Sequence, residues 1–237
     1  MKGKLSLIVA ASVLLAAASV AVYAAGPKPS PVIGSDGKTV FTAAVPSNSK
    51  ASTTPAPDDG TVTIYDNLAE VYPKGLYNCC QGAIVSGPDS PGFTEWWDAV
   101  AFTPSTNVSI TEIELALGYE SGTNQVILTL ANDASGLPGT RIRSWILKDI
   151  PLAGTCCDLV TVNDNHGIAV TAGVQYWLML TTNGADRDAF FSWNVNDTDQ
   201  IDSALGAARC RGLGCRGNGE WVATQESPAL AYAIFGK

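Results

Sequence analysis

Short apolar runs with a period of two fill the chain from about residue 61 onward. Residues 113–117 read Ile-Glu-Leu-Ala-Leu, residues 126–130 repeat the alternation, and residues 174–180 form a mostly apolar run. A period of two is typical of strands that bury one face. Turn signals, such as Gly-Leu-Pro-Gly at 136–139 and Thr-Asn-Gly at 182–184, separate these runs. The pattern predicts about ten strands and no long amphipathic helix.

Strands at this spacing are typical of two packed antiparallel sheets. The chain has 237 residues, which is enough to bury a substantial core. We therefore expect an all-β domain over residues 61–237, built as an antiparallel β-sandwich of jelly-roll type.

The N-terminus has the pattern of a secretory signal peptide. Lys2 and Lys4 precede an apolar run of 18 residues at 5–22, and Val22-Tyr23-Ala24 places small or tolerated residues at the two positions that a signal peptidase reads. We expect cleavage after Ala24, so that residues 1–24 are the signal and the protein is extracellular, periplasmic or on the cell surface. The alternative is an uncleaved anchor, because the run reaches the lower limit for crossing a bilayer.

Residues 25–60 are rich in Pro, Ser and Thr and contain no Trp, Tyr or Cys. Such a segment buries too little apolar surface to offset chain entropy, so we expect a linker. A short edge strand at Val32-Ile33 and Val40-Phe41 is the alternative.

Charge narrows the range of partners. The chain has 14 Lys plus Arg against 22 Asp plus Glu, a net charge of -8. Signal cleavage removes Lys2 and Lys4, which leaves 12 basic residues and a net charge of -10. We therefore expect no nucleic-acid partner and, after cleavage, no membrane partner. The expected mature protein is a monomer.

Catalytic patterns are sparse. The single His, His166, lies in the turn-like run Asn-Asp-Asn-His-Gly at 163–167, and no G-x-S-x-G elbow occurs. This favours a non-enzymatic protein.

Several motifs together resemble those of bacterial extracellular choice-of-anchor R domains. They are Trp97–Pro104 followed by Ile110–Leu115, the turn Gly136-Leu137-Pro138-Gly139, and Thr171–Leu178. The resemblance spans Asp66 to Gly236. It implies an exported β-sandwich domain, and it implies no activity, because the family has no settled biochemical function.

The six cysteines form an even set in an exported chain, which favours disulfides. Cys210 and Cys215 bracket a short Gly-containing loop, so we expect them to pair. The other four cysteines form two adjacent pairs, Cys79-Cys80 and Cys156-Cys157. Either one pair bridges to the other, or each pair closes as a vicinal disulfide. A zinc site is disfavoured by the Cys-Cys spacing.

Two features indicate ligand binding. Arg209, Arg211 and Arg216 concentrate positive charge around the Cys210–Cys215 loop and suit an acidic glycan or a phosphate group, with a solvated loop as the alternative.

Adjacent strand residues face opposite ways, so Trp96 and Trp97 cannot both enter one core. One of them, with Tyr119 as a neighbour, is a candidate for stacking on a sugar. The G-x-G-x-x-G match at 212–217 lacks the strand and helix of a dinucleotide site.

An oxygen-rich cluster follows the apolar run at 190–193. Its members are Asn194, Asn196, Asp197, Asp199 and Asp202. Calcium takes such ligands, so a structural calcium ion is possible here, with an ordinary polar turn as the alternative. We expect no other cofactor.

Taken together, these features favour an exported, non-catalytic binding or surface-interaction module for a glycan or a cell-envelope ligand. One alternative is a secreted carbohydrate-active enzyme with paired carboxylates, and the other is a structural protein of an envelope or matrix. The candidate acids are Glu95, Asp98, Glu112, Glu114 and Glu120. We expect Glu112 and Glu114 to point to solvent.

Overall fold

The computed structural model describes residues 60–68, 77–154, 158–196, 205–212, 215, 219–224 and 229–237, and the strand backbone at 32–33 and 39–40. The predicted signal peptide and most of the predicted linker lie outside these residues. In the described part of the chain, no helix is long and apolar enough to cross a membrane.

The described chain is all-β, and every pairing between its strands is antiparallel. Its strands are β1 (Val32–Ile33), β2 (Thr39–Val40), β3 (Val62–Asp66), β4 (Asn78–Ser86), β5 (Thr94–Phe102), β6 (Val108–Leu115), β7 (Leu117–Ser121), β8 (Gln125–Asp133), β9 (Pro138–Lys148), β10 (Val160–Val170), β11 (Tyr176–Thr181), β12 (Phe190–Val195), β13 (Gly206–Gly212), β14 (Trp221–Thr224) and β15 (Tyr232–Gly236).

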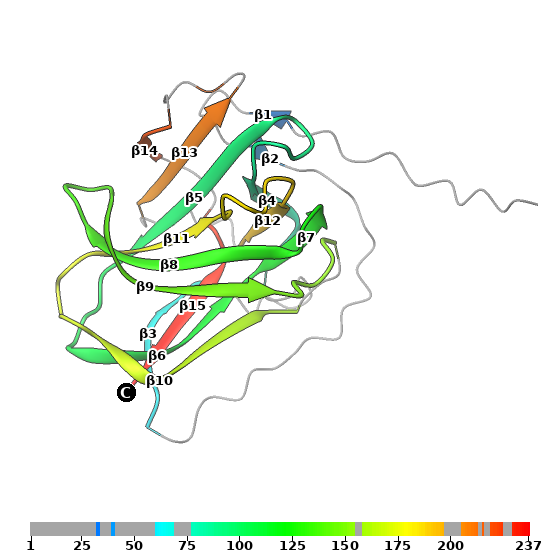
Figure 1. Cartoon of the computed structure of the whole chain (residues 1–237). Helices are drawn as coiled ribbons and strands as arrows, with labels where there is room; N and C mark the ends of the chain where they lie inside the picture. Colours follow the sequence, from blue (N-terminus) through cyan, green and yellow to red (C-terminus); the bar gives the residue numbers. More distant parts are fainter. Residues whose placement is uncertain are drawn as a thin grey trace, which may run out of the picture.

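Two sheets make up the domain (Figure 1). The smaller has four strands in the order β10-β6-β15-β3, and the larger has nine. The larger sheet runs β7-β12-β4-β5-β11-β8-β9, and β13 joins it by pairing with β5 and β14. The strands β1 and β2 pair only with each other, so the short strand weighed for the linker forms a separate hairpin and not a sheet edge.

Strand β5 is the branch point of the larger sheet. It pairs with β13 over residues 94–100 and with β11 over residues 98–102, but it meets β4 only at Trp96, opposite Ser86. The sheet therefore curls where β4 leaves β5. The even-numbered side chains of β5 pack into two separate clusters, with Trp96 in one and Val100 and Phe102 in the other.

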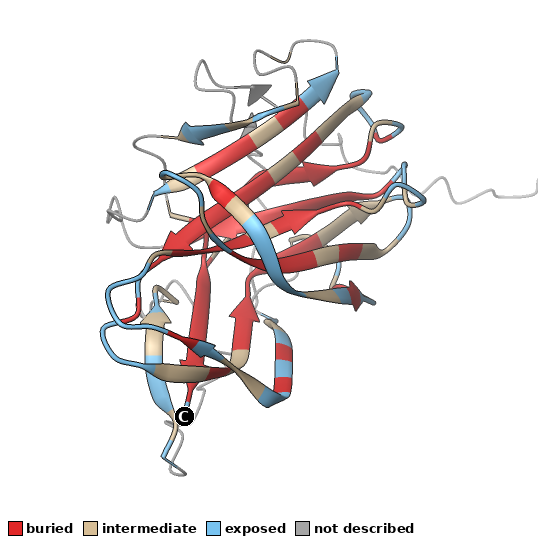
Figure 2. Cartoon of the chain, turned by 60° about the vertical axis from the view of Figure 1, so that its left-hand side comes forward, coloured by how far each residue is buried: buried red, intermediate tan, exposed pale blue. Residues whose placement is uncertain are grey.

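The main core lies between the two sheets, as the alternation predicts (Figure 2). Ile113 and Leu115 on β6 are buried, as are Leu128 and Leu130 on β8. The sandwich-like packing of two antiparallel sheets is thus present, with thirteen strands in the two sheets where about ten were expected.

One reason for the larger number is that residues 113–117 belong to two strands. Leu115 pairs with Tyr232 in the smaller sheet, whereas Leu117 pairs with Trp193 in the larger one. Ala116, fully buried between them, passes the chain from one sheet to the other. A second reason is β10, which continues through the predicted turn at 163–167 as a strand with an irregular register.

Two sequence expectations about single residues are wrong. His166 lies in the irregular stretch of strand β10 and not in a turn, where Gly167 adopts a positive φ of 66°. Glu114 does not point to solvent, because its residue is only 7% exposed.

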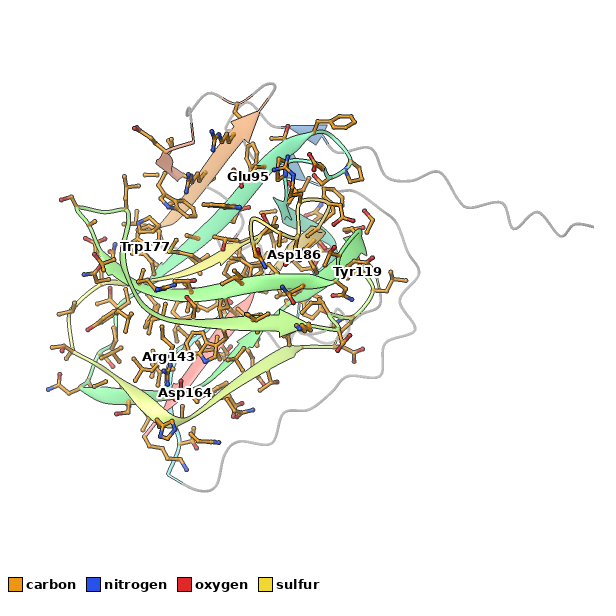
Figure 3. The ribbon with its side chains drawn as sticks, viewed as in Figure 1. Glu95, Tyr119, Arg143, Asp164, Trp177 and Asp186 are labelled. Atoms are coloured by element: carbon orange, nitrogen blue, oxygen red, sulfur yellow. A yellow bond between two sulfur atoms is a disulfide. The ribbon has the colours of Figure 1, made fainter. Side chains whose placement is uncertain are left out.

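An ion pair links the edges of the two sheets. Arg143 Nε on β9 donates to Asp164 Oδ2 on β10 at 2.9 Å, and Figure 3 shows the two side chains on these neighbouring strands. The backbone N–H of His166 donates to the other oxygen of Asp164. This contact fixes β9, the last strand of the larger sheet, against β10.

Candidate functional site

Three side chains form a row across β5, β13 and β14, at the β14 edge of the larger sheet. The register places Trp97 on β5 opposite Arg209 on β13, and Arg209 opposite Trp221 on β14. Residues in register on neighbouring strands point to the same face of a sheet. All three are partly exposed, so they form a surface, which we call the aromatic–arginine row.

The two indoles converge on the arginine. The guanidinium carbon of Arg209 lies 4.2 Å from the centre of the Trp97 ring, within the range of a cation–π contact. The ring centres of Trp97 and Trp221 are 6.5 Å apart. Strands β5 and β14 are separated by β13, which implies a spacing of about 9.6 Å between their backbones. The rings therefore lean toward Arg209.

Two contacts fix the orientation of the Trp97 ring, a hydrogen bond and a cation–π contact. Its Nε1–H donates to Thr182 Oγ1 at 3.3 Å, while Arg209 lies against its ring. A ring held in this way loses little conformational freedom when it binds a ligand.

Small side chains support the row from within the sheet. Ala99 pairs with Ala207, and these two residues pack with the fully buried Trp177 in a cluster that Trp221 also contacts. Trp177 Nε1–H donates to Asp133 Oδ1 at 2.8 Å. The aromatic–arginine row thus stands on a packed, hydrogen-bonded layer.

The two arginines at the row, Arg209 and Arg211, form no ion pair among the described residues. The Nε of Arg209 is buried without a hydrogen-bond partner there. Arg211 lies opposite Glu95, but neither arginine takes part in the two described ion pairs, which join Arg143 to Asp164 and Arg187 to Asp89. An unpartnered buried donor is unfavourable.

The disulfide between Cys210 and Cys215 is formed, as expected from the loop between them. Their Cα atoms are 5.5 Å apart, and Gly212 within the loop has a φ of 136°, which favours glycine. Cys210 faces away from Arg209 and packs with Trp96 in a small buried cluster. The disulfide therefore closes the end of β13 on the face opposite the row.

Of the two adjacent tryptophans, Trp97 reaches the surface. Trp96 is buried, at 6% exposure, beside Ile84 and Phe190. Tyr119 lies on β7, where its ring contacts Phe191 and its hydroxyl donates to Gly122 O, well away from Glu95 on β5 (Figure 3). The geometry thus groups Trp97, Arg209 and Arg211, and it leaves Trp96 and Tyr119 outside the surface.

The remaining residues predicted to bind a ligand, bind a metal or form a disulfide lie mostly outside the described residues. These are Arg216, Asp197, Asp199, Asp202, Cys156 and Cys157, and for Cys79 and Cys80 only the β4 backbone is described. Asn194 and Asn196 are buried, and Asn196 Oδ1 has no hydrogen-bond partner among the described residues. No group of three His, Cys, Asp or Glu suited to a metal ion occurs in that part of the chain.

Phe93 is a surface residue that the sequence analysis missed. Its side chain is 74% exposed and its φ is 52°, a conformation that bulky residues rarely adopt. Its N–H donates to Ser90 O, and the Asp89–Arg187 ion pair links the same loop to the loop at 182–189. The Pro-Gly dipeptide before it was the available signal, because Pro and Gly indicate a turn and turns lie at the surface.

The candidate carboxylates are dispersed. Glu112 and Glu114 share the outer face of β6, Glu120 is on β7, and Asp98 is buried at 2% exposure. Burial raises the pKa of Glu114, and the negative charges of Glu112 and Asp66 raise it further. Burial also raises the pKa of Glu120, against a hydrogen bond with Ser192 that lowers it.

Comparisons with known proteins add no assignment. No family model, no curated protein and no solved structure matches the chain. The resemblance to choice-of-anchor R domains therefore stays a prediction from the motifs.

Proposed function

We propose that the chain is an exported, non-catalytic binding module whose ligand is a glycan of the cell envelope or its surroundings. In this proposal the sandwich is of the jelly-roll type seen in the domains that the motifs resemble. The aromatic–arginine row at the β14 edge of the larger sheet is the binding surface.

The observation that carries the proposal is the fixed, partly exposed Trp97. Its indole is oriented by Thr182, covered on one side by Arg209, and followed by a second indole at 6.5 Å. Aromatic faces bind the apolar faces of sugar rings, and a pre-oriented ring reduces the entropic cost of doing so. A row of this kind at the end of a rigid sheet suits recognition of a polymer.

Two features support export. The N-terminal segment has the order of charged, apolar and small residues found in secretory signals. The Cys210–Cys215 disulfide is of a kind that persists in oxidising compartments and is rare in the cytosol.

One observation favours the enzymatic alternative. Glu114 has a raised pKa and lies two residues from Glu112 on the same face of β6, and glycosidases use a carboxyl group of raised pKa together with a second carboxyl group. The buried position of Glu114 works against it, because a general acid must reach the glycosidic oxygen.

The proposal is tested by retention on immobilised polysaccharides. The oxidised full chain is passed over a panel of neutral and acidic polymers, with calcium and with a chelator, beside its Trp97→Ala and Ile146→Ala variants. Truncating a central tryptophan typically costs about 2 kcal/mol, or about 30-fold in affinity. We expect that loss for Trp97→Ala on at least one polymer and no loss for Ile146→Ala, which removes an exposed apolar side chain on β9.

Three results would count against parts of the proposal. Retention on no polymer contradicts the glycan ligand, and equal retention of the Trp97→Ala variant contradicts the site. New reducing ends released from a bound polymer contradict the non-catalytic role. A loss of retention with the chelator would support the predicted calcium ion.

A further inference from the structure

The strongest unexplained feature beside the row is a pair of arginines, Arg209 and Arg211, that no described ion pair joins to a carboxylate, although Glu95 lies opposite Arg211. The protein carries a net charge of -8, yet two arginines stand two residues apart on one face of β13 with no described ion pair. A neutral sugar needs an aromatic surface and polar contacts, but it does not need two guanidinium groups.

The two arginine side chains converge. A methyl group placed on Gly219 would lie 3.7 Å from Arg211 Cδ and 3.9 Å from Arg209 Nη2. The chain at Gly219 is held by its N–H, which donates to Cys210 O at 3.0 Å. Both side chains therefore pass the same fixed point at Gly219, and Arg209 also lies against the Trp97 ring.

A planar carboxylate fits such a pair of arginines. The guanidinium group presents parallel N–H donors that match the two oxygens of a carboxylate, and charge-assisted hydrogen bonds are stronger than neutral ones. The terminal N–H groups of Arg209 and Arg211 are the donors that a carboxylate would meet, because the Nε of Arg209 is buried.

The binding surface extends beyond one sugar ring. Phe93 immediately precedes β5 and stands four residues before Trp97, a separation of up to about 13 Å along an extended chain. Its carbonyl oxygen would lie 3.0 Å from a methyl group on Gly212, so Phe93 is next to the end of β13. Arg211, opposite Glu95, lies between the two aromatic residues along this path.

From these observations we infer that the ligand is a polysaccharide rich in uronic acids, bound along β5 and β13 with a sugar ring at Trp97 and Trp221 and its carboxylates at Arg209 and Arg211. This inference rests on the proposed glycan-binding function and specifies its ligand class. The highly exposed Phe93 provides a second aromatic contact for the same chain.

The test compares polygalacturonate with the same polymer after chemical reduction of its carboxyl groups, and with dextran sulfate. Affinity is measured by calorimetry for the oxidised full chain and for the variants Arg211→Gln, Arg209→Lys, Phe93→Ala, Trp97→Ala and Arg141→Gln. Arg141 is an exposed arginine on β9 and serves as the matched control.

We expect polygalacturonate to bind and its reduced form to bind at least about tenfold more weakly. Arg211→Gln and Arg209→Lys should each lower the affinity by about tenfold, whereas Arg141→Gln leaves it unchanged. Binding should weaken in about 1 M salt, where the screening length falls to about 3 Å.

Two outcomes overturn the inference and leave the proposed function standing. In the first, the reduced polymer binds as tightly as polygalacturonate and depends on Trp97. In the second, Arg141→Gln lowers the affinity as much as Arg211→Gln. Equal binding of dextran sulfate that survives Trp97→Ala indicates ion exchange only and also overturns it. Failure to bind any polymer in the panel rejects the inference and the proposed function together.

Discussion

Asp164 is the buried half of the ion pair that joins the two sheets. Its side chain is 6% exposed, and the hydrogen bond from Arg143 holds the pKa of Asp164 below its ordinary value of 3.8. The His166 N–H and the His166 ring charge lower this pKa further, while burial opposes them. A carboxylate with a lowered pKa stabilises the fold above its ordinary pKa, and that stability is lost as the pH falls through the folded value.

Replacement of Asp164 should therefore give a pH-dependent loss of stability. We expect Asp164→Asn to unfold at a lower urea concentration than the wild type at about pH 7, with the difference shrinking toward about pH 2. Asp89→Asn is the matched control, because Asp89 and Arg187 form an exposed ion pair at 55% and 56% side-chain exposure. Exposed pairs contribute little, so a loss as large for Asp89→Asn as for Asp164→Asn would contradict the assignment.

Other single residues show where local pattern is enough and where it is not. Adjacent strand positions must face opposite ways, so the sequence predicts that Trp96 and Trp97 separate, and they do. It does not predict which one is exposed, because both faces of β5 are packed at this point. The burial of Glu114 was also unpredictable, since alternation places it on the outer face of β6 but does not say what packs over that face.

At the scale of elements, strand β13 brings the candidate site together. It pairs with β5 from Gly206 to Gly212 and with β14 from Gly206 to Arg209, and its end is closed by the disulfide. A disulfide that closes a loop of this size stabilises the fold by about 2 kcal/mol, because it restricts the unfolded chain.

The double variant Cys210→Ser/Cys215→Ser should lower the free energy of unfolding by about 2 kcal/mol, measured by denaturant unfolding under oxidising conditions. Reduction of the wild type is a poorer test, because it also reduces any bridges made by the other four cysteines. Because β5 and β13 pair over seven positions, the row should persist and retain its ligand. Unchanged stability of the variant would show that the bridge does not form.

Whether a contact between elements could be predicted depends on how far apart its residues lie in the sequence. The Cys210–Cys215 loop is local and was predicted from its two glycines. The pairing of Trp97 with Arg209 joins residues more than a hundred positions apart, and nothing in either strand specifies that register. The division of residues 113–117 between β6 and β7 was likewise hidden, because the alternation continues through Ala116 while the chain changes sheets.

At the scale of the molecule, the two sheets are held together by more than apolar packing. Tyr232 on β15 donates from its hydroxyl to Ala101 O on β5 at 3.1 Å, in a fully buried position. Its ring stacks on Tyr65 at 4.4 Å and meets the edge of Trp193 at 6.2 Å. The hydrogen bond thus connects the smaller sheet with the strand that carries Trp97.

Tyr232→Phe should keep the ring contacts and remove only this connection between sheets. The loss of a buried hydrogen bond costs about 1 to 2 kcal/mol, and we expect the free energy of unfolding to fall by that amount. Tyr119→Phe removes a hydroxyl that bonds within its own turn, where water can replace it, and should cost less. If Tyr232 also positions β5, its loss should weaken ligand binding at Trp97 under conditions where the variant is fully folded. Equal stability of the two variants would show that this hydrogen bond contributes nothing to holding the sheets together.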